Sequence, residues 1–264
     1  MNQKELFKKV KLYSGIFAKS KKRIVAKLLS ADTYTLLEKQ RILKEVDEEL
    51  KKLSIKSNSW LSTNLKGIYK EGATDIMAYL KDIGMESMTY SKYDLEAIMN
   101  LSGNSKAIMN EAISGIHRST SNVLSRATKS KLQAMITEGR VSSQTLKEIA
   151  GNLAKELAKN NVVLYDGKGR KWDIEAYSEL VARTEMMNSY NQGVTNQLLQ
   201  RKHDLAYVTS YMSCQCDICK SWEGKVLSLT GETTGYPTLD DAYADGLFHP
   251  NCKHTLRPYY PPLE

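Results

Sequence analysis

Apolar residues recur at helical spacing through most of the chain before residue 160. The clearest stripe lies between residues 32 and 54 and consists of Leu36, Leu43, Val46, Leu50 and Leu53. It covers only about two and a half heptads, so we expect packing against a neighbouring helix and not an independent coiled coil. The same spacing predicts further helices at residues 58–82, 92–100, 105–137 and 143–158.

The pattern changes at residue 162. A short β-run at 162–165, a glycine-containing turn and a return at 171–173 predict a β-hairpin. Asp173 is suited to cap a helix that runs to about residue 202, and residues 205–212 resemble a strand. The chain is therefore expected to be an α+β protein, with a long, mainly helical N-terminal region and a small α/β C-terminal module. The expected divisions are a basic arm (1–30), a helical region (31–160) and the C-terminal module (161–264).

Composition supports a folded chain without a membrane segment. Of 264 residues, 41% are hydrophobic, and the mean hydropathy is -0.45. No stretch approaches the ~18 apolar residues of a membrane span, so we expect no membrane-spanning segment. The first residues lack a signal-peptide pattern, so we expect an intracellular protein. All five prolines fall after residue 236, and all four cysteines lie between 214 and 252. Long helices suit the proline-free part, and the end of the chain must be built differently.

The positive charge is concentrated at the N-terminus. Residues 1–28 hold nine basic side chains and one acid, Glu5, which accounts for the formal net charge of +8 of the whole chain. Such an arm could form an amphipathic helix that contacts nucleic acid, an acidic protein or a membrane surface. A solvated terminus that aids solubility is an equally good interpretation.

Six possible metal ligands fall into two tight groups near the end of the chain: Cys214, Cys216 and Cys219, then His249, Cys252 and His254. A Cys-x-x-Cys turn directs two thiolates at one centre, and a second pair from a distant loop completes a zinc tetrahedron. Cys216 and Cys219 are the natural first pair, although Cys214 could replace Cys216. The second pair is Cys252 with either His254 or His249. Pro250 and Asn251 would hold the second loop in a tight turn.

The alternatives to a metal site are disulfides and free buried thiols. Disulfides are disfavoured because nothing marks the chain as secreted, and chance clustering of every cysteine beside two histidines is disfavoured too. A catalytic zinc needs an open position beside a general base, and Glu223 and Asp217 lie in no HExxH or HxE arrangement. We therefore expect a structural zinc and no enzymatic activity. Two rivals remain, an HNH-like metal-dependent nuclease and a zinc-containing nucleic-acid adaptor.

The order of motifs after residue 160 resembles a known family. The runs are Leu164–Trp172, Ala176–Glu185 with Asn188, Asn191 and Gly193, the strand Asp204–Val208, the cysteine cluster, Trp222–Val226, Tyr236-Pro237, and Gly246–Leu256 with Pro258-Tyr259. Together they resemble the phage minor capsid proteins, which are related to the Mu F-like head morphogenesis proteins. The likeness covers residues 160–262, and the helical part resembles the family only in character.

The resemblance implies a structural protein of the virion that resides in the phage head, and in the host cytoplasm during assembly. It implies partners at the portal vertex, namely the portal protein and other capsid proteins, and a role in head assembly or in DNA packaging or ejection. Packaged DNA could contact the basic arm. Relatives carry Cys or His at the position of His254, which favours it over His249 as a ligand. Many also carry a histidine just before the CxxC, where this chain has Tyr211-Met212 and an added Cys214.

The segment Arg183-Thr184-Glu185 belongs to the same family motif and invites a catalytic interpretation. We favour a structural one, in which Arg183 and Glu185 form a buried ion pair that docks their helix on the cysteine-containing loops.

Overall fold

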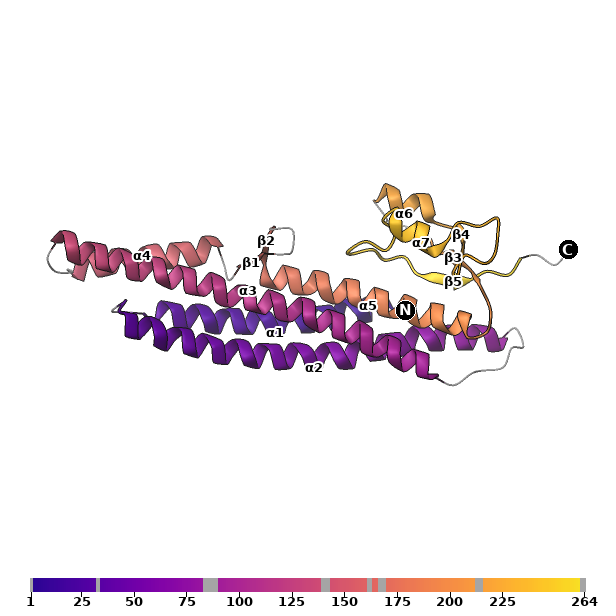
Figure 1. Cartoon of the computed structure of the whole chain (residues 1–264), viewed down its shortest axis with the longest axis horizontal. Helices are drawn as coiled ribbons and strands as arrows, with labels where there is room; N and C mark the ends of the chain where they lie inside the picture. The colour runs from indigo at the N-terminus through magenta and orange to yellow at the C-terminus, as the bar shows by residue number, and fades with distance from the viewer. Residues whose placement is uncertain are drawn as a thin grey trace. The chain divides into compact units, whose positions relative to one another are not determined.

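The computed structural model describes residues 2–31, 34–82, 90–138, 143–160, 163–165, 170–211 and 216–261 (Figure 1). Five long helices make up most of it: α1 (Gln3–Leu29), α2 (Leu36–Asp82), α3 (Lys92–Glu138), α4 (Ser143–Asn160) and α5 (Ile174–Leu199). Short strands and two short helices follow α5. This confirms the expected fold class. No helix in the described part of the chain combines the length and the hydropathy that a membrane crossing needs.

Two helix breaks expected from the sequence do not occur. α2 and α3 are each a continuous helix of 47 residues, where the periodicity suggested two shorter ones in each case. Ser57, which directly precedes the expected second helix, lies mid-helix and fully buried, and its hydroxyl is 2.7 Å from the Tyr13 hydroxyl. Because its hydroxyl is bonded to another side chain, the serine does not form a hydrogen bond with the nearby backbone that would compete with the helix.

The hairpin before α5 is present. β1 (Val163–Tyr165) pairs antiparallel with β2 (Lys171–Asp173), and the turn between residues 166 and 169 lies outside the described residues. Asp173 caps α5 as expected, because its Oδ1 accepts hydrogen bonds from the backbone N–H of Glu175 and of Ala176, at 2.9 and 3.3 Å.

The chain forms two compact units. The first comprises Met1–Val10, Leu61–Ser105 and Leu180–Glu264, and the second comprises Lys11–Trp60 and Lys106–Glu179. Neither grouping follows the divisions at residues 30 and 160 that we expected, which remain a prediction. Each unit is described by itself below.

The second unit has a helical core to which α1 contributes. Tyr13, Phe17 and Ile24 of α1 are fully buried, and the Tyr13 ring lies 4.4 Å from that of Trp60. Four basic residues of α1 form ion pairs with its neighbours: Lys11 with Glu179, Lys21 with Asp173 and Glu175, Arg23 with Glu49, and Lys27 with Glu45. The residues expected to form a separate basic arm are therefore a core helix with a cationic outer side. The predicted stripe of α2 is buried at Val46, Leu50 and Leu53, whereas Leu36 is exposed.

In the first unit, α2 and α5 cross at glycine. A methyl group built on Gly72 would come closer than 3.0 Å to the carbonyl oxygen of Tyr190, and one built on Gly193 would do the same to that of Tyr69. Two polar contacts accompany this approach. The Ser189 hydroxyl donates to the Leu65 carbonyl at 2.8 Å, and the Tyr190 hydroxyl donates to the Asp75 carboxylate at 2.6 Å.

A three-stranded antiparallel sheet completes the first unit. Its order is β4 (Val226–Ser228), β3 (Leu205–Val208) and β5 (Leu256–Pro258), with α6 (Asp217–Trp222) between β3 and β4, and α7 (Leu239–Ala244) between β4 and β5. The sequence predicted β3 but none of the other four elements. Asp204 closes the loop after β4, because its carboxylate accepts hydrogen bonds from the hydroxyls of Ser228, Thr230 and Thr233.

Candidate metal centre

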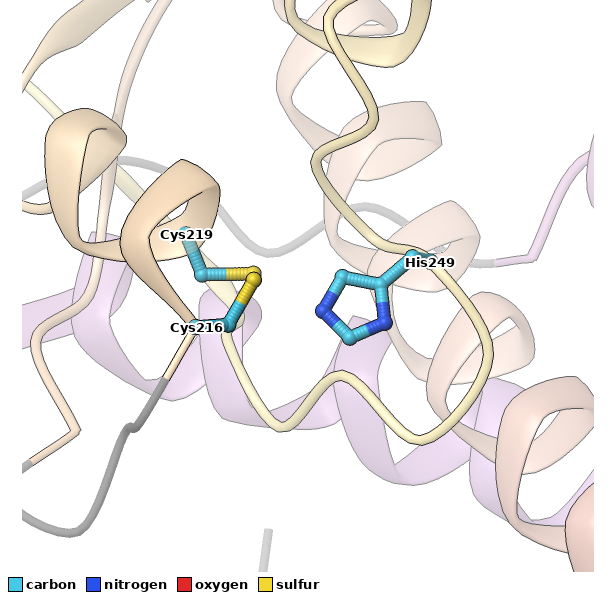
Figure 2. A group of neighbouring side chains, drawn as sticks. All are labelled: Cys216, Cys219 and His249. Atoms are coloured by element: carbon cyan, nitrogen blue, oxygen red, sulfur yellow. The ribbon is translucent and has the colours of Figure 1, made fainter.

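The first group of donors lies at the start of α6. Cys216 is the N-cap residue of this helix and Cys219 lies in its first turn, so one turn of backbone brings the two side chains together. Figure 2 shows both sulfurs on the same side of α6, facing the imidazole ring of His249 across a gap. The Cys-x-x-Cys spacing thus produces the convergence that the sequence predicted.

The second group lies on the loop between α7 and β5. The Cys252 N–H donates to the carbonyl of His249 at 2.8 Å, and Asn251 between them has a φ of 69°. Proline at the second position, a positive φ at the third and a bond from the fourth residue to the first are the features of a type II turn. The tight turn expected at Pro250 and Asn251 is confirmed.

The helix α5 holds this loop in place. Its Arg183 guanidinium donates to the Asn251 side-chain oxygen at 2.9 Å, and the Asn251 N–H donates to the Thr184 hydroxyl at 3.3 Å. Glu185 points elsewhere and accepts a hydrogen bond from Ser105 of α3 at 2.8 Å. The docking role proposed for this segment is therefore correct, but it acts through Asn251 and not through an Arg183–Glu185 ion pair.

Asn191, also on α5, binds the chain just beyond the turn. Its amide nitrogen donates to the His254 carbonyl and its amide oxygen accepts from the Leu256 N–H, each at 3.3 Å. One side chain thereby satisfies two buried backbone groups that no strand partner reaches on that side. The path of the backbone from Cys252 into β5 is fixed as a result.

The spacing of the donor atoms fits a tetrahedral cation. The sulfurs of Cys219 and Cys252 lie 3.7 Å apart, and the Cys252 sulfur lies 3.3 Å from Nδ1 of His254. A tetrahedral zinc with sulfur ligands at ~2.3 Å and nitrogen at ~2.0–2.1 Å separates two sulfurs by about 3.8 Å and a sulfur and a nitrogen by about 3.6 Å. The three side chains, all buried, need to move little to share a zinc ion.

His254 is oriented for this role by Glu223. The Nε2 atom of His254 lies 2.7 Å from a Glu223 carboxylate oxygen, which leaves Nδ1 directed at the sulfurs. A carboxylate on the far nitrogen is the usual outer partner of a metal-binding histidine. The hydrogen bond from His254, followed by one from the Tyr211 N–H, lowers the pKa of Glu223. The glutamate considered above as a general base instead positions the imidazole.

His249 forms a second, overlapping group with Cys216 and Cys219, in which the three donor atoms lie within 4.8 Å of one another. Its Nδ1 lies 2.8 Å from the Pro250 carbonyl oxygen, and its buried Nε2 has no hydrogen-bond partner among the described residues. Both histidines therefore present a nitrogen to the sulfurs, and Cys219 is common to both groups.

The protonation of the Cys219 sulfur depends on whether a cation is bound. Burial, together with the neighbouring Cys252 and Cys216 thiols, raises the pKa of Cys219. Without a cation Cys219 therefore favours the protonated thiol, whereas a bound divalent cation stabilises thiolates and releases their protons.

The structure brings together five of the six residues singled out in the sequence: Cys216, Cys219, His249, Cys252 and His254. Cys214 lies outside the described residues, as does Met212. Sequence reasoning missed the supporting contacts of Asn191 and Asn251. Asn191 is far from the cysteines along the chain, and the signal for it was its place in the family run, whereas Asn251 adjoins Cys252 but was expected only to shape the turn.

Comparison with known proteins identifies the chain at the level of a family. A structural protein of Lactococcus phage LL-H is 31% identical over 104 residues, which are 36% of this chain and 28% of that protein, so the chain covers little more than a quarter of that relative's length. No solved structure is significantly similar. A family model described as Phage minor capsid protein 2 matches residues 3–264, which includes the helical region as well as the module with the cysteines. The chain therefore belongs to the family of phage minor capsid protein 2.

Proposed function

We propose that this protein is a structural component of the phage head that acts at the portal vertex, in head assembly or in DNA packaging or ejection. Its partners would be the portal protein and other capsid proteins, with packaged DNA contacted through the basic N-terminal residues. It would reside in the virion, and in the host cytoplasm while heads are assembled. The observation that carries the proposal is the family match across residues 3–264.

We propose further that zinc holds the C-terminal module together through Cys216, Cys219, Cys252 and His254, with His249 as the alternate nitrogen donor. Two loops separated by about thirty residues supply these donors, and closing such a loop costs a few kcal/mol of chain entropy. The strands around it have only three or four residues each. A structural zinc contributes ~10 kcal/mol or more in small folds, which is ample to offset that cost.

A structural zinc suits this site better than a catalytic one. Four protein ligands fill a tetrahedral zinc, and a catalytic site keeps one position for water. Cys219, Cys252 and His254 are each less than a tenth exposed, and the nearby Glu223 is already bonded to His254. The nuclease alternative has a direct test, which is incubation with plasmid DNA and Mg²⁺ or Mn²⁺. Cleavage that disappears in His249→Ala would contradict the structural role.

The virion role is tested on particles. We expect the protein in purified phage at few copies, and a localised reconstruction of the head should place it at the portal vertex. Its absence from purified particles would overturn the proposal and favour the host adaptor.

The zinc site is tested by elemental analysis of protein purified without added metal. We expect about one zinc per chain, lost in Cys219→Ser and in Cys252→Ser, and kept in the control Ser221→Ala on the same helix α6. His254→Ala should lower zinc retention more than His249→Ala. A full zinc content in both cysteine variants would refute the assignment.

A further inference from the structure

A groove lined by cations runs between α1 and α2 in the second unit. It has a volume of about 250 Å³. Its floor includes Gly15, Ile16, Ser20 and Leu53. Five basic residues line it, from both helices: Lys11, Lys19, Arg23, Lys52 and Lys56.

Only part of this positive charge is neutralised within the molecule. Glu49 is the single carboxylate among the described lining residues, and it already pairs with Arg23 at 3.1 Å. Lys11 pairs with Glu179. Lys19, Lys52 and Lys56 make no ion pair with any residue that the structure describes. Among the residues that the structure describes, the ammonium groups of these three exposed lysines therefore have no ion-pair partner.

The floor of the groove has a polar group without a partner. Ser20 is only 3% exposed, and its hydroxyl has no hydrogen-bond partner within the described part of the chain. A buried hydroxyl without a bond costs free energy, and an anion in the groove would accept the missing hydrogen bond. Gly15 also lines the groove, and a methyl group added there meets no atom within 4 Å, so the groove is open at that point.

The spacing of the cations favours an extended polyanion over a small ion. Lys19 and Arg23 are four residues apart on α1, as are Lys52 and Lys56 on α2. The two members of each pair are therefore separated by about 6 Å along the helix axis. From Lys11 to Arg23 the row spans about 18 Å. A duplex carries one negative charge per ~1.7 Å of its axis and so presents several phosphates over that length.

We propose that this groove binds the phosphate backbone of duplex DNA without sequence preference. The described lining residues include no aromatic ring on which single-stranded bases would stack, and no Asn or Gln to read base edges. Naming DNA as the polyanion rests on the proposed role in the phage head, since the charge alone would also accept an acidic peptide.

The test measures the affinity of the full chain for a fluorescein-labelled 25-base-pair duplex of arbitrary sequence, by anisotropy, between 50 and 200 mM NaCl. Three phosphate contacts predict a slope of about −2.7 in log K against log salt, which is about 40-fold weaker binding over that range. The variant Lys19→Gln/Lys52→Gln/Lys56→Gln should lose most of this slope and about tenfold or more in affinity at 50 mM. The control Lys44→Gln/Lys66→Gln/Lys129→Gln removes the same charge outside the groove and should bind almost as the wild type.

A pair of single substitutions separates the groove from the overall charge. Gly15→Glu places a carboxylate on the floor, whereas Gly67→Glu adds the same charge at another open helical glycine. Only Gly15→Glu should weaken binding. Equal effects of the two, DNA affinity unchanged in the triple groove variant, or binding of a glutamate-rich peptide without binding of DNA would each overturn the inference. A wild-type chain that is present in particles but has no affinity for DNA at 50 mM refutes this inference and leaves the proposed virion role intact.

Discussion

The substitution Gly193→Ala should destabilise the first unit although alanine is the better helix former. Gly193 lies on α5 where it crosses α2, and its missing side chain lets the helix backbones approach directly. An added methyl group would come closer than 3.0 Å to the Tyr69 carbonyl oxygen, whereas ordinary contact begins at 3.4 Å. The backbones of α2 and α5 must then separate by at least 0.4 Å. The obstructing atom is a backbone carbonyl oxygen held by its helix, and it cannot move aside as the end of a flexible side chain could.

The expected magnitude is the difference of two opposing effects. Overpacking of a tight contact costs ~1–3 kcal/mol, and the backbone location of this clash puts it at the upper end. Replacing glycine by alanine in a helix gains about 1 kcal/mol. The net loss is therefore about 2 kcal/mol, which corresponds to about 4–8 °C in melting temperature for a chain of this size.

The assay is differential scanning calorimetry of Gly193→Ala beside Gly67→Ala. Gly67 lies on α2 in the same unit, and a methyl group there meets no atom within 4 Å, so this control should melt about 2–4 °C above the wild type. Gly72→Ala, on the other side of the crossing, should behave as Gly193→Ala does. A Gly193→Ala variant that melts as high as Gly67→Ala would refute the close crossing of α2 and α5.

Three further outcomes follow from contacts described above. Asn191→Ala leaves the His254 carbonyl and the Leu256 N–H without a partner, at about 1–3 kcal/mol for each buried group, so limited proteolysis should cut the chain sooner after residue 245 and zinc should dissociate faster. Burial alone raises the pKa of Asp204, but hydrogen bonds from Ser228, Thr233 and Thr230 outweigh it and hold the pKa well below the unfolded value of about 3.9. The stabilisation is therefore present above about pH 4 and is lost as the pH falls through the folded pKa, so Asp204→Asn should speed proteolysis of the loop after β4 at pH 7 and have less effect near pH 2. Thr238 accepts from the Asp241 N–H in a capping box, and Thr238→Ala should cost about 1 kcal/mol, seen as faster amide exchange within α7.

The sequence was sufficient to locate α2 and α3 but not to show that each is continuous. Helical spacing of apolar residues is a strong signal over 47 residues, and it located α2 and α3 correctly. It placed false breaks between residues 54 and 58 and between residues 100 and 105, two short stretches that contain Ser57 and Gly103, residue types common at helix ends. In the folded chain the Ser57 hydroxyl is bonded to Tyr13, and Gly103 has open space around it. Neither fact is visible without the neighbouring helices.

The C-terminal module was harder to predict because its elements are too short to carry a periodic pattern. β4 and β5 have three residues each, and α6 and α7 have six. Their positions are set by long-range hydrogen bonds from residues such as Asn191 and Asp204, which come from α5 and from the start of β3. The ligand residues, in contrast, were identifiable, because cysteine and histidine are scarce and the spacing of Cys216 and Cys219 is itself a geometric signal.

The segment from Cys252 to Leu256 has a fixed length for two independent reasons. Cys252 and His254 lie in the candidate metal centre, and two residues later Leu256 pairs with Val208 in the sheet and is buried. An inserted residue would either withdraw the imidazole or turn every later side chain of β5 to the opposite face. Natural variation in chain length within this family should therefore accumulate between β4 and α7, where the hydrogen bonds of Asp204 hold a loop that carries no metal ligand. It should be absent from Cys252 to Leu256.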